Sequence, residues 1–171
     1  GYRYYLIPGL SEPLPSVTSI LSTISKPGLI SWEKEVAIDY ARENISKYIG
    51  NIENKNLDGL HEIFEKAKKQ PNFIKTKAGE FGTKAHKFIE LLLQQNFDVD
   101  VPSNMKWIYK NFNDWKNEYN FKSFEQEKYL YSSKYGYGGT ADSIGLVNEN
   151  LFILDWKTSK NLYIENLLQV S

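Results

Sequence analysis

The sequence predicts a mixed fold of the α+β (or α/β) class, because its hydrophobic periodicity changes once along the chain. Apolar residues recur at helical spacing through much of residues 1–121, whereas from about residue 122 short segments alternate as strands do. A chain of 171 residues without internal repeats suits one domain. We therefore expect a single domain over residues 1–171, helical over about 1–121 and built on a sheet over about 122–171.

Five helices are expected before residue 122. Ser16 follows Pro15 and precedes a short apolar helix, so it is a candidate N-cap. The other four helices are expected over residues 29–49, 57–69, 79–95 and 102–121. Gly50 is expected to close the second helix. Pro71 is expected to lie beyond the end of the third, because proline removes a helical hydrogen bond.

Three strands are expected in the remainder, over residues 124–133, 140–147 and 151–157. Residues 148–150 (Asn-Glu-Asn) are typical of a turn between the last two, since Asn tolerates a positive φ. A final helix is expected from about Asn161, and it reaches Ser171 without a C-cap. The chain begins with Gly1 rather than Met, so we expect that its natural N-terminus is missing. Because the final helix lacks a C-cap, we also expect the natural protein to continue beyond Ser171.

Composition excludes several classes of site. Cysteine is absent, which excludes a disulfide framework, a thiolate zinc site, an iron–sulfur cluster and a cysteine nucleophile. No apolar run approaches the ~20 residues of a membrane span. Basic and acidic residues balance at 21 each, which argues mildly against a nucleic-acid partner. The balance hides seven lysines against one acid between Lys66 and Lys87, a pattern typical of a solvated helix face or of a surface that attracts phosphates.

Two aspartates and a lysine are expected to meet at one end of the last hairpin. Asp155 and Lys157 are two residues apart on an apolar strand, so both point to one face. If residues 148–150 close a hairpin, Asp142 falls opposite Trp156 or Lys157 and near Asp155. Neighbouring carboxylates repel unless a cation lies between them, and their oxygens suit Mg²⁺ or Mn²⁺. The alternative is a salt-bridged strand end in which Lys157 pairs with both aspartates.

Several motifs follow one another in a fixed order. They are Gly82-Thr83-Lys84-Ala85-His86-Lys87-Phe88-Ile89-Glu90, then Gly138-Gly139-Thr140-Ala141-Asp142, then Asp155-Trp156-Lys157-Thr158-Ser159-Lys160, and Gln169 on the next helix. Together they resemble the PD-(D/E)XK nuclease superfamily, and most of all its RecB-like branch, which includes phage exonucleases and the mitochondrial genome maintenance exonuclease. Residues 15–18 and Glu127 are similar to further features of that branch. Ala141 departs from the proline in the superfamily's name, and relatives with a four-cysteine iron–sulfur cluster are poor guides to this chain.

The resemblance implies a restriction-endonuclease-like core, with a mixed β-sheet and flanking helices. It implies a deoxyribonuclease that uses Mg²⁺ or Mn²⁺ and acts as an exonuclease at single-stranded DNA ends, in replication, recombination or repair. We expect such a protein in the cytoplasm of a bacterium or phage-infected host, or in the mitochondrial matrix. The alternatives are an endonuclease, a nuclease component of a helicase–nuclease complex, and a non-catalytic nucleic-acid-binding module.

Site residues are carried over from the matching motifs. The expected catalytic residues are Asp142, Asp155, Lys157, Glu90 and Gln169. The expected metal ligands are Asp142, Asp155, the Trp156 backbone carbonyl, His86 and Glu90. The expected DNA contacts are Thr158, Ser159, Lys160, Lys84 and Lys87. Taken alone, His86 also fits a hydrogen-bonded core histidine, and Glu90 an exposed helix charge.

Aromatic residues and lysines alternate along residues 106–122. The aromatic residues are Trp107, Tyr109, Phe112, Trp115, Tyr119 and Phe121. Such a mixture holds single strands by stacking and by phosphate neutralisation. The alternative is an amphipathic helix whose aromatic face belongs to the core.

Overall fold

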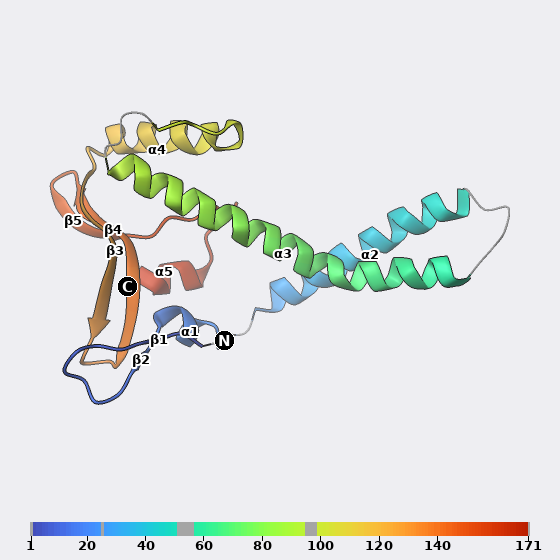
Figure 1. Ribbon diagram of the computed structural model, residues 1–171, viewed down its shortest axis with the longest axis horizontal. Coiled ribbons are helices and arrows are strands. Elements are labelled where there is room, and N and C mark those ends of the chain that lie inside the picture. The colour runs from blue at the N-terminus through green and yellow to red at the C-terminus, as the bar shows by residue number, and fades with distance from the viewer. Residues whose placement is uncertain (1, 25, 51–56, 95–98, 171) are drawn as a thin grey trace. The chain divides into compact units, whose positions relative to one another are not determined.

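The computed structural model describes residues 2–24, 26–50, 57–94 and 99–170, and it contains helices and two small antiparallel sheets (Figure 1). The predicted α+β class is confirmed. Both sheets of the described part are antiparallel rather than mixed, apart from an isolated parallel bridge between Ser16 and Gly138. None of the helices in this part of the chain is long and apolar enough to cross a membrane.

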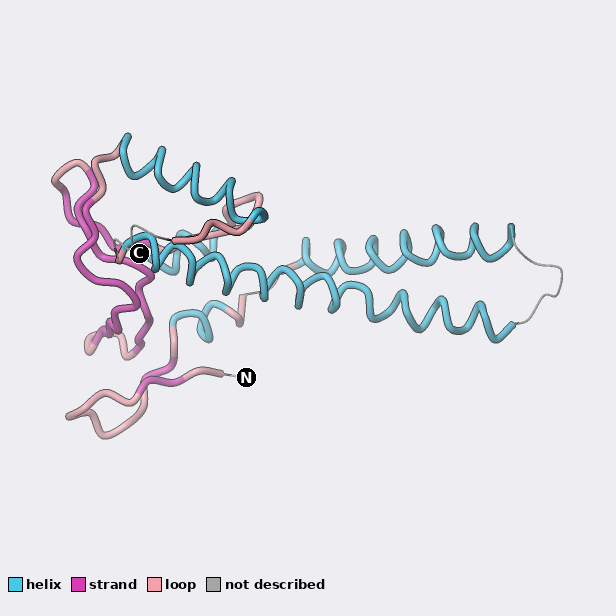
Figure 2. Tube along the Cα trace, turned by 45° about the horizontal axis from the view of Figure 1, so that its top comes forward, coloured by secondary structure: helices cyan, strands magenta, loops and turns pink. Residues whose placement is uncertain are grey.

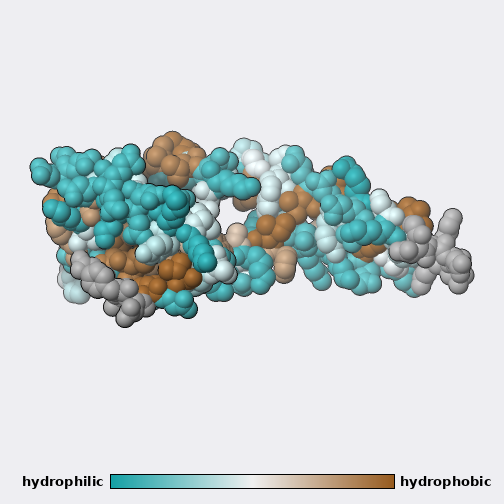
Figure 3. Space-filling model, turned by 90° about the horizontal axis from the view of Figure 1, so that it is seen from above, coloured by the Kyte–Doolittle hydropathy of each residue, from teal (hydrophilic) through white to brown (hydrophobic). Residues whose placement is uncertain are grey.

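The chain divides into two compact units, Gly1–Ile24 with Gly82–Ser171, and Ser25–Phe81. This boundary falls within a helix. The second unit pairs α2 (Pro27–Gly50) with the first part of α3 (Leu57–Leu93). The two helices lie side by side in Figure 2, and their visible face in Figure 3 is largely hydrophilic.

Helix α3 continues through Pro71, so the expected break before this residue and the separate helix from residue 79 are wrong. A proline inside a helix costs about 3 kcal/mol. The Pro71 ring is buried, as is Ala67 one turn earlier. Ion pairs between Glu65 and Lys68 and between Lys77 and Glu80 support the turns on either side. Burial and intact flanking turns therefore outweigh the missing hydrogen bond.

The first unit is built on a three-stranded antiparallel sheet in the order β3-β4-β5. Its strands are β3 (Lys122–Ser132), β4 (Tyr137–Val147) and β5 (Asn150–Leu154). All three were expected, with shifted ends. The turn between β4 and β5 is also confirmed, because Asn148 and Glu149 have φ values of 46° and 68°, as a tight hairpin turn requires.

The end of β5 corrects the expected register of the site. The strand stops at Leu154, so Asp155 and Lys157 follow it instead of lying on it. Ser143 pairs with Leu154. Continuing this register by one step brings Asp142 level with Asp155, and not with Trp156 or Lys157 as we expected.

The core of this unit lies between the end of α3, the short helix η1 (Ser103–Met105), α4 (Lys106–Glu118) and the sheet. Its buried apolar residues are Ala85, Phe88, Ile89, Leu93, Met105, Ile108, Phe112, Phe121 and Ala141. The helix expected over residues 102–121 ends earlier than predicted, at Glu118. A Cβ on Gly145 would lie 2.6 Å from the Phe121 ring, so only glycine allows this ring to rest on β4.

The N-terminal segment packs against β4 through the short strands β1 (Tyr4–Tyr5) and β2 (Leu14–Pro15), which the sequence did not predict. The Ser16 hydroxyl accepts a 3.0 Å hydrogen bond from the Ser19 N–H and caps α1 (Val17–Leu21), as expected. Helix α5 (Ile164–Val170) begins three residues later than predicted and contacts α1.

Candidate active site

A cleft of about 690 Å³ opens in the unit that contains the three-stranded sheet. Its walls come from the N-terminal segment, the part of α3 after Gly82, strands β3 and β4, and the segment that follows β5. The predicted site residues that line it are His86, Lys87, Glu90, Glu127, Asp142, Asp155, Lys157 and Gln169. Most of the residues expected to perform chemistry therefore face one cavity.

Asp142 lies near the middle of β4, and its side chain is 13% exposed. Its Oδ2 accepts a 2.6 Å hydrogen bond from the Trp156 N–H, and the Nδ1 atom of His86 lies 3.3 Å from the same oxygen. The hydrogen bond to Asp142 raises the pKa of His86 and outweighs the opposing effect of burial. His86 is therefore a partner of Asp142, and its side chain, 30% exposed, is not part of the buried core.

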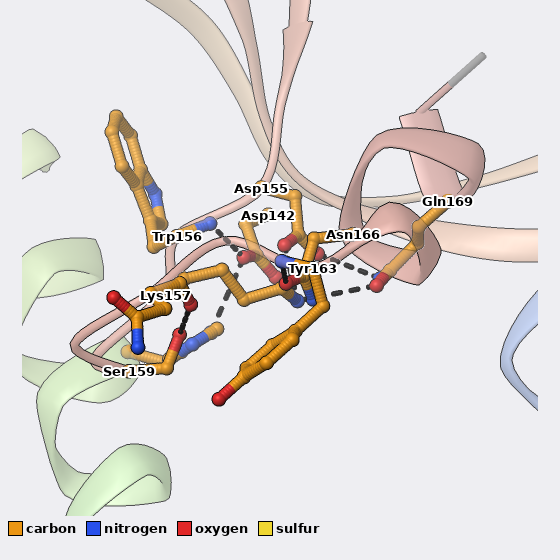
Figure 4. A network of polar contacts seen from close by, with 10 residues as sticks. Asp142, Asp155, Trp156, Lys157, Ser159, Tyr163, Asn166 and Gln169 are labelled. Carbon is orange, nitrogen blue, oxygen red and sulfur yellow. Dashed lines mark hydrogen bonds and ion pairs between the residues drawn. The ribbon is translucent and has the colours of Figure 1, made fainter. Parts of the chain in front are cut away.

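Asp155, Lys157 and Gln169 form a closed group of three side chains (Figure 4). The Gln169 Nε2 donates a 2.7 Å hydrogen bond to Asp155 Oδ1, and its Oε1 accepts one of 3.2 Å from Lys157 Nζ. The Lys157 ammonium also pairs with Asp155 Oδ2. The two ends of the glutamine amide thus bridge the carboxylate and the ammonium.

Burial dominates the electrostatics of Asp155, whose side chain is 10% exposed. Burial raises the pKa of Asp155, the ammonium of Lys157 lowers it, and the nearby charge of Asp142 raises it again, with a net upward shift. A cation placed beside this carboxylate stabilises its ionised form.

Trp156 connects the site to the core. Its indole points away from the carboxylates in Figure 4 and packs on Phe112, Trp115 and Phe121, at centroid distances of 5.6, 5.4 and 6.2 Å. Successive side chains of an extended segment point to opposite faces, so Asp155 and Lys157 face the cleft while Trp156 faces the core. Its backbone N–H donates to Asp142, and a metal-binding role of its carbonyl stays a prediction.

Glu90 faces the cleft from α3, one turn after His86. Its carboxylate pairs with Lys87 Nζ at 2.9 Å and accepts a 3.1 Å hydrogen bond from Gln94 Nε2. It therefore lies on the wall of the cleft while its oxygens are engaged by neighbours on the same helix. Its expected roles as a catalytic residue and metal ligand stay predictions.

Glu127 has an unusual backbone for a residue within a strand. Its φ is 50°, in the left-handed region that disfavours side chains with a Cβ. The register of its neighbours in β3 places it opposite Asp142. Burial raises the pKa of Glu127, and the charges of Asp142 and Glu90 raise it further. Backbone strain of this kind is concentrated at functional sites.

Arg3 also lines the cleft, although nothing in the sequence singled it out. Its backbone is held on both sides, because its N–H donates to Ser19 Oγ at 2.8 Å and its carbonyl accepts from the Ser16 N–H at 2.9 Å. A guanidinium is well suited to bind phosphate oxygens. A single arginine near the N-terminus has no motif around it, so only the fold brings it to the site.

The expected DNA contacts are scattered. Ser159 and Lys160 are exposed, and the Ser159 hydroxyl donates to the Asn161 carbonyl at 2.8 Å. Lys84 is exposed on α3, and Lys87 pairs with Glu90. Thr158 does not line the cleft but a second cavity beside α4. The cleft thus brings together the expected catalytic residues more closely than the expected DNA contacts.

The basic segment between Lys66 and Lys87 is largely neutralised. Five of its seven lysines form ion pairs, namely Lys66, Lys68, Lys75, Lys77 and Lys87, with Glu62, Glu65, Glu33, Glu80 and Glu90. Four of these acids lie outside the segment in the sequence. The solvated helix face therefore accounts for most of this charge.

Within the described residues, no three His, Asp or Glu side chains come close enough to hold a metal ion by themselves. Mg²⁺ does not need a complete protein cage, since it binds through one or two carboxylates and keeps several waters. Asp142 and Asp155, which the register of β4 and β5 brings level with each other at the cleft, match this requirement. The residues present thus fit Mg²⁺ or Mn²⁺.

In comparisons with known proteins, no family model, no curated protein and no solved structure matches this chain. The similarity to the RecB-like branch therefore rests on the motifs alone and stays a prediction. The restriction-endonuclease-like core stays one too.

Proposed function

We propose that this protein is a metal-dependent nuclease that hydrolyses phosphodiester bonds, as an exonuclease at single-stranded DNA ends. The observation that carries the proposal is the meeting of Asp142, Asp155 and Lys157 at one cleft, with Gln169 bridging the last two. Paired carboxylates that suit a hard cation, together with an ammonium, are the groups that phosphodiester hydrolysis requires.

Asp142 and Asp155 would hold Mg²⁺ or Mn²⁺, and His86 and Glu90 are the further ligands implied by the motifs. When bound, such an ion lowers the pKa of a water molecule and neutralises charge on the phosphate. The protein's own contribution is orientation. The Trp156 N–H and His86 direct the Asp142 carboxylate, and Gln169 directs that of Asp155.

Lys157 supplies a positive charge at the cleft. Its ammonium is held between Asp155 and Gln169, which supports an electrostatic role: it stabilises the negative charge that develops on the phosphate oxygens. Arg3 lines the same cleft and is suited to hold a neighbouring phosphate. The same cleft is lined by the carboxylates of Glu90, Glu127, Asp142 and Asp155.

The contacts of the two aspartates argue against the alternative of a salt-bridged strand end. A salt-bridged strand end requires Lys157 to pair with both aspartates. In the described residues Lys157 pairs with Asp155, whereas Asp142 is bonded to His86 and Trp156. Each carboxylate thus has its own partners, which supports a built site over a single bridging pair.

The test is cleavage of end-labelled single-stranded and duplex DNA in Mg²⁺, Mn²⁺ or EDTA, with Asp155→Ala beside the wild type. We expect metal-dependent shortening from one end that the variant lacks, and the label that disappears first gives the polarity. Cleavage of circular single-stranded DNA would instead identify an endonuclease. DNA binding without cleavage in either metal would contradict the proposal and favour the binding module.

A further inference from the structure

A second cavity, of about 290 Å³, lies beside α4 in the same unit. Its lining includes Trp107, Asn111 and Trp115 from α4, and Trp156, Lys157 and Thr158 from the segment after β5. Lys157 also lines the catalytic cleft, so the two cavities meet at the proposed catalytic lysine. We call this cavity the Trp107 pocket.

The aromatic residues of α4 divide into two groups. Phe112 is buried, and Trp115 packs on Trp156 and Phe121, so these residues form the aromatic core face that was one of the two expectations. Trp107 lines the pocket with half of its surface (50%) exposed. Asn111 lines the pocket one turn further along the same helix.

We propose that the Trp107 pocket binds one unstacked nucleobase of a single-stranded nucleic acid, which stacks on the indole of Trp107. The proposal rests on the proposed function and deepens it, because it assigns the preference for single strands to a particular residue. Stacking on an exposed aromatic ring is the usual way to hold an unpaired base. The side-chain amide of Asn111 offers both a donor and an acceptor to the edge of the base.

Size and position favour this occupant. A volume of about 290 Å³ is near the lower end of small-molecule sites. Most of the lining is apolar or aromatic, with Ile89, Ile108 and Phe112 beside the tryptophans, which suits the flat face of a base, and Thr158 adds a hydroxyl. A base is joined to its phosphate through one sugar, so adjacent cavities that share Lys157 suit adjacent parts of one strand. Paired bases of a duplex are stacked and unavailable for such a pocket.

The first experiment measures binding of a fluorescein-labelled single-stranded 12-mer in EDTA by fluorescence anisotropy. We expect Trp107→Ala to raise Kd by at least about fivefold, and Trp107→Phe, which keeps a stacking ring, to stay near the wild type. Tyr109→Ala is the matched control, since Tyr109 is 42% exposed on the same helix but does not line the pocket. We expect it to change nothing. Thermal melts monitored by circular dichroism establish that all variants are folded.

The second experiment moves one abasic position along the 12-mer. We expect one position at which the wild type loses affinity and Trp107→Ala shows no further loss. If the wild type cleaves DNA but no position responds, or if Trp107→Ala weakens blunt duplex binding equally, the pocket proposal is overturned and the nuclease proposal stands. If the wild type responds at one position but never cleaves, the pocket stands and the nuclease fails. If it neither binds nor cleaves, both are overturned.

Discussion

Trp156 and Asp142 are joined by a 2.6 Å hydrogen bond from the backbone N–H of one to the Oδ2 of the other. The indole of the same tryptophan is packed in the aromatic core between α4 and the sheet. The packed indole thus fixes the position of the backbone N–H that holds the Asp142 carboxylate in the cleft. This arrangement makes the site dependent on packing that lies outside it.

Asp155→Asn should lower cleavage strongly without loss of stability. Because the pKa of Asp155 is raised on folding, its ionised form is less favourable in the folded chain than in the unfolded one, and the neutral amide removes this cost above the folded pKa. We expect at least about a hundredfold lower kcat and an unchanged or higher Tm in EDTA at pH 7.5. A lower Tm with retained cleavage would show that the carboxylate is structural.

Gln169→Glu should affect chemistry more than substrate binding. The new carboxylate would lie beside Asp155 and raise its pKa further by like-charge repulsion. We expect kcat to fall about a hundredfold with a nearly unchanged KM, and the acidic limb of the pH–rate profile to move to higher pH. Gln169→Ala removes a donor to the carboxylate without adding a charge, so it should lower kcat and move that limb by a smaller amount. Identical profiles for the two variants would contradict the bridging role.

His86 should titrate above its ordinary pKa of 6.5 in metal-free protein, because Asp142 stabilises the imidazolium. A raised folded pKa adds stability that is present in full below 6.5 and is lost as the pH rises through the folded pKa. NMR titration of the imidazole signals in a His61→Gln background measures this directly. Asp142→Asn should return the midpoint toward 6.5 or below; a midpoint unaffected by that substitution would argue against the contact.

Phe112→Ala should destabilise the protein by about 3–5 kcal/mol, as expected for removal of a buried aromatic side chain. Because Phe112 supports the Trp156 indole, kcat should fall as well, through loosening of Asp142. Urea unfolding gives the change in stability. Tyr109→Ala on the same helix should lower the stability by less than about 1 kcal/mol. An equal loss of stability in both variants would show that the aromatic core does not support the site.

Glu149→Gly should stabilise the β4–β5 hairpin by about 1 kcal/mol. Glu149 has a φ of 68°, where a Cβ is strained, and an Asn-Gly pair is the preferred sequence for such a turn. Glu149→Ala keeps the Cβ and should give no gain. A Tm that rises for both variants would assign the gain to loss of charge rather than to the backbone.

Features that depend on neighbours in the sequence were predictable. The N-cap at Ser16 and the turn at Asn148 and Glu149 follow from local hydrogen bonding and backbone preferences, and both are present. The break at Pro71 was predicted by the same local reasoning and is absent. There the burial of the ring, which the sequence does not reveal, outweighed the local cost.

The candidate site could be predicted only in part. Residue types and spacing singled out Asp142, Asp155 and Lys157, but their register was misplaced because β5 ends at Leu154. Arg3 had no signal in the sequence, since its place at the cleft depends on the packing of the N-terminal segment against β4. The left-handed backbone of Glu127 was equally invisible.

By itself, the sequence determined the α+β class, the hairpin and the set of ionisable residues, because periodicity, turn chemistry and side-chain type are local properties. Only the tertiary structure decided which of these residues share a cleft. It joined Gln169 to Asp155 and Lys157, attached His86 to Asp142, and separated the aromatic core from the exposed Trp107. These choices are set by contacts between segments far apart in the chain, where burial and charge act on the folded protein as a whole.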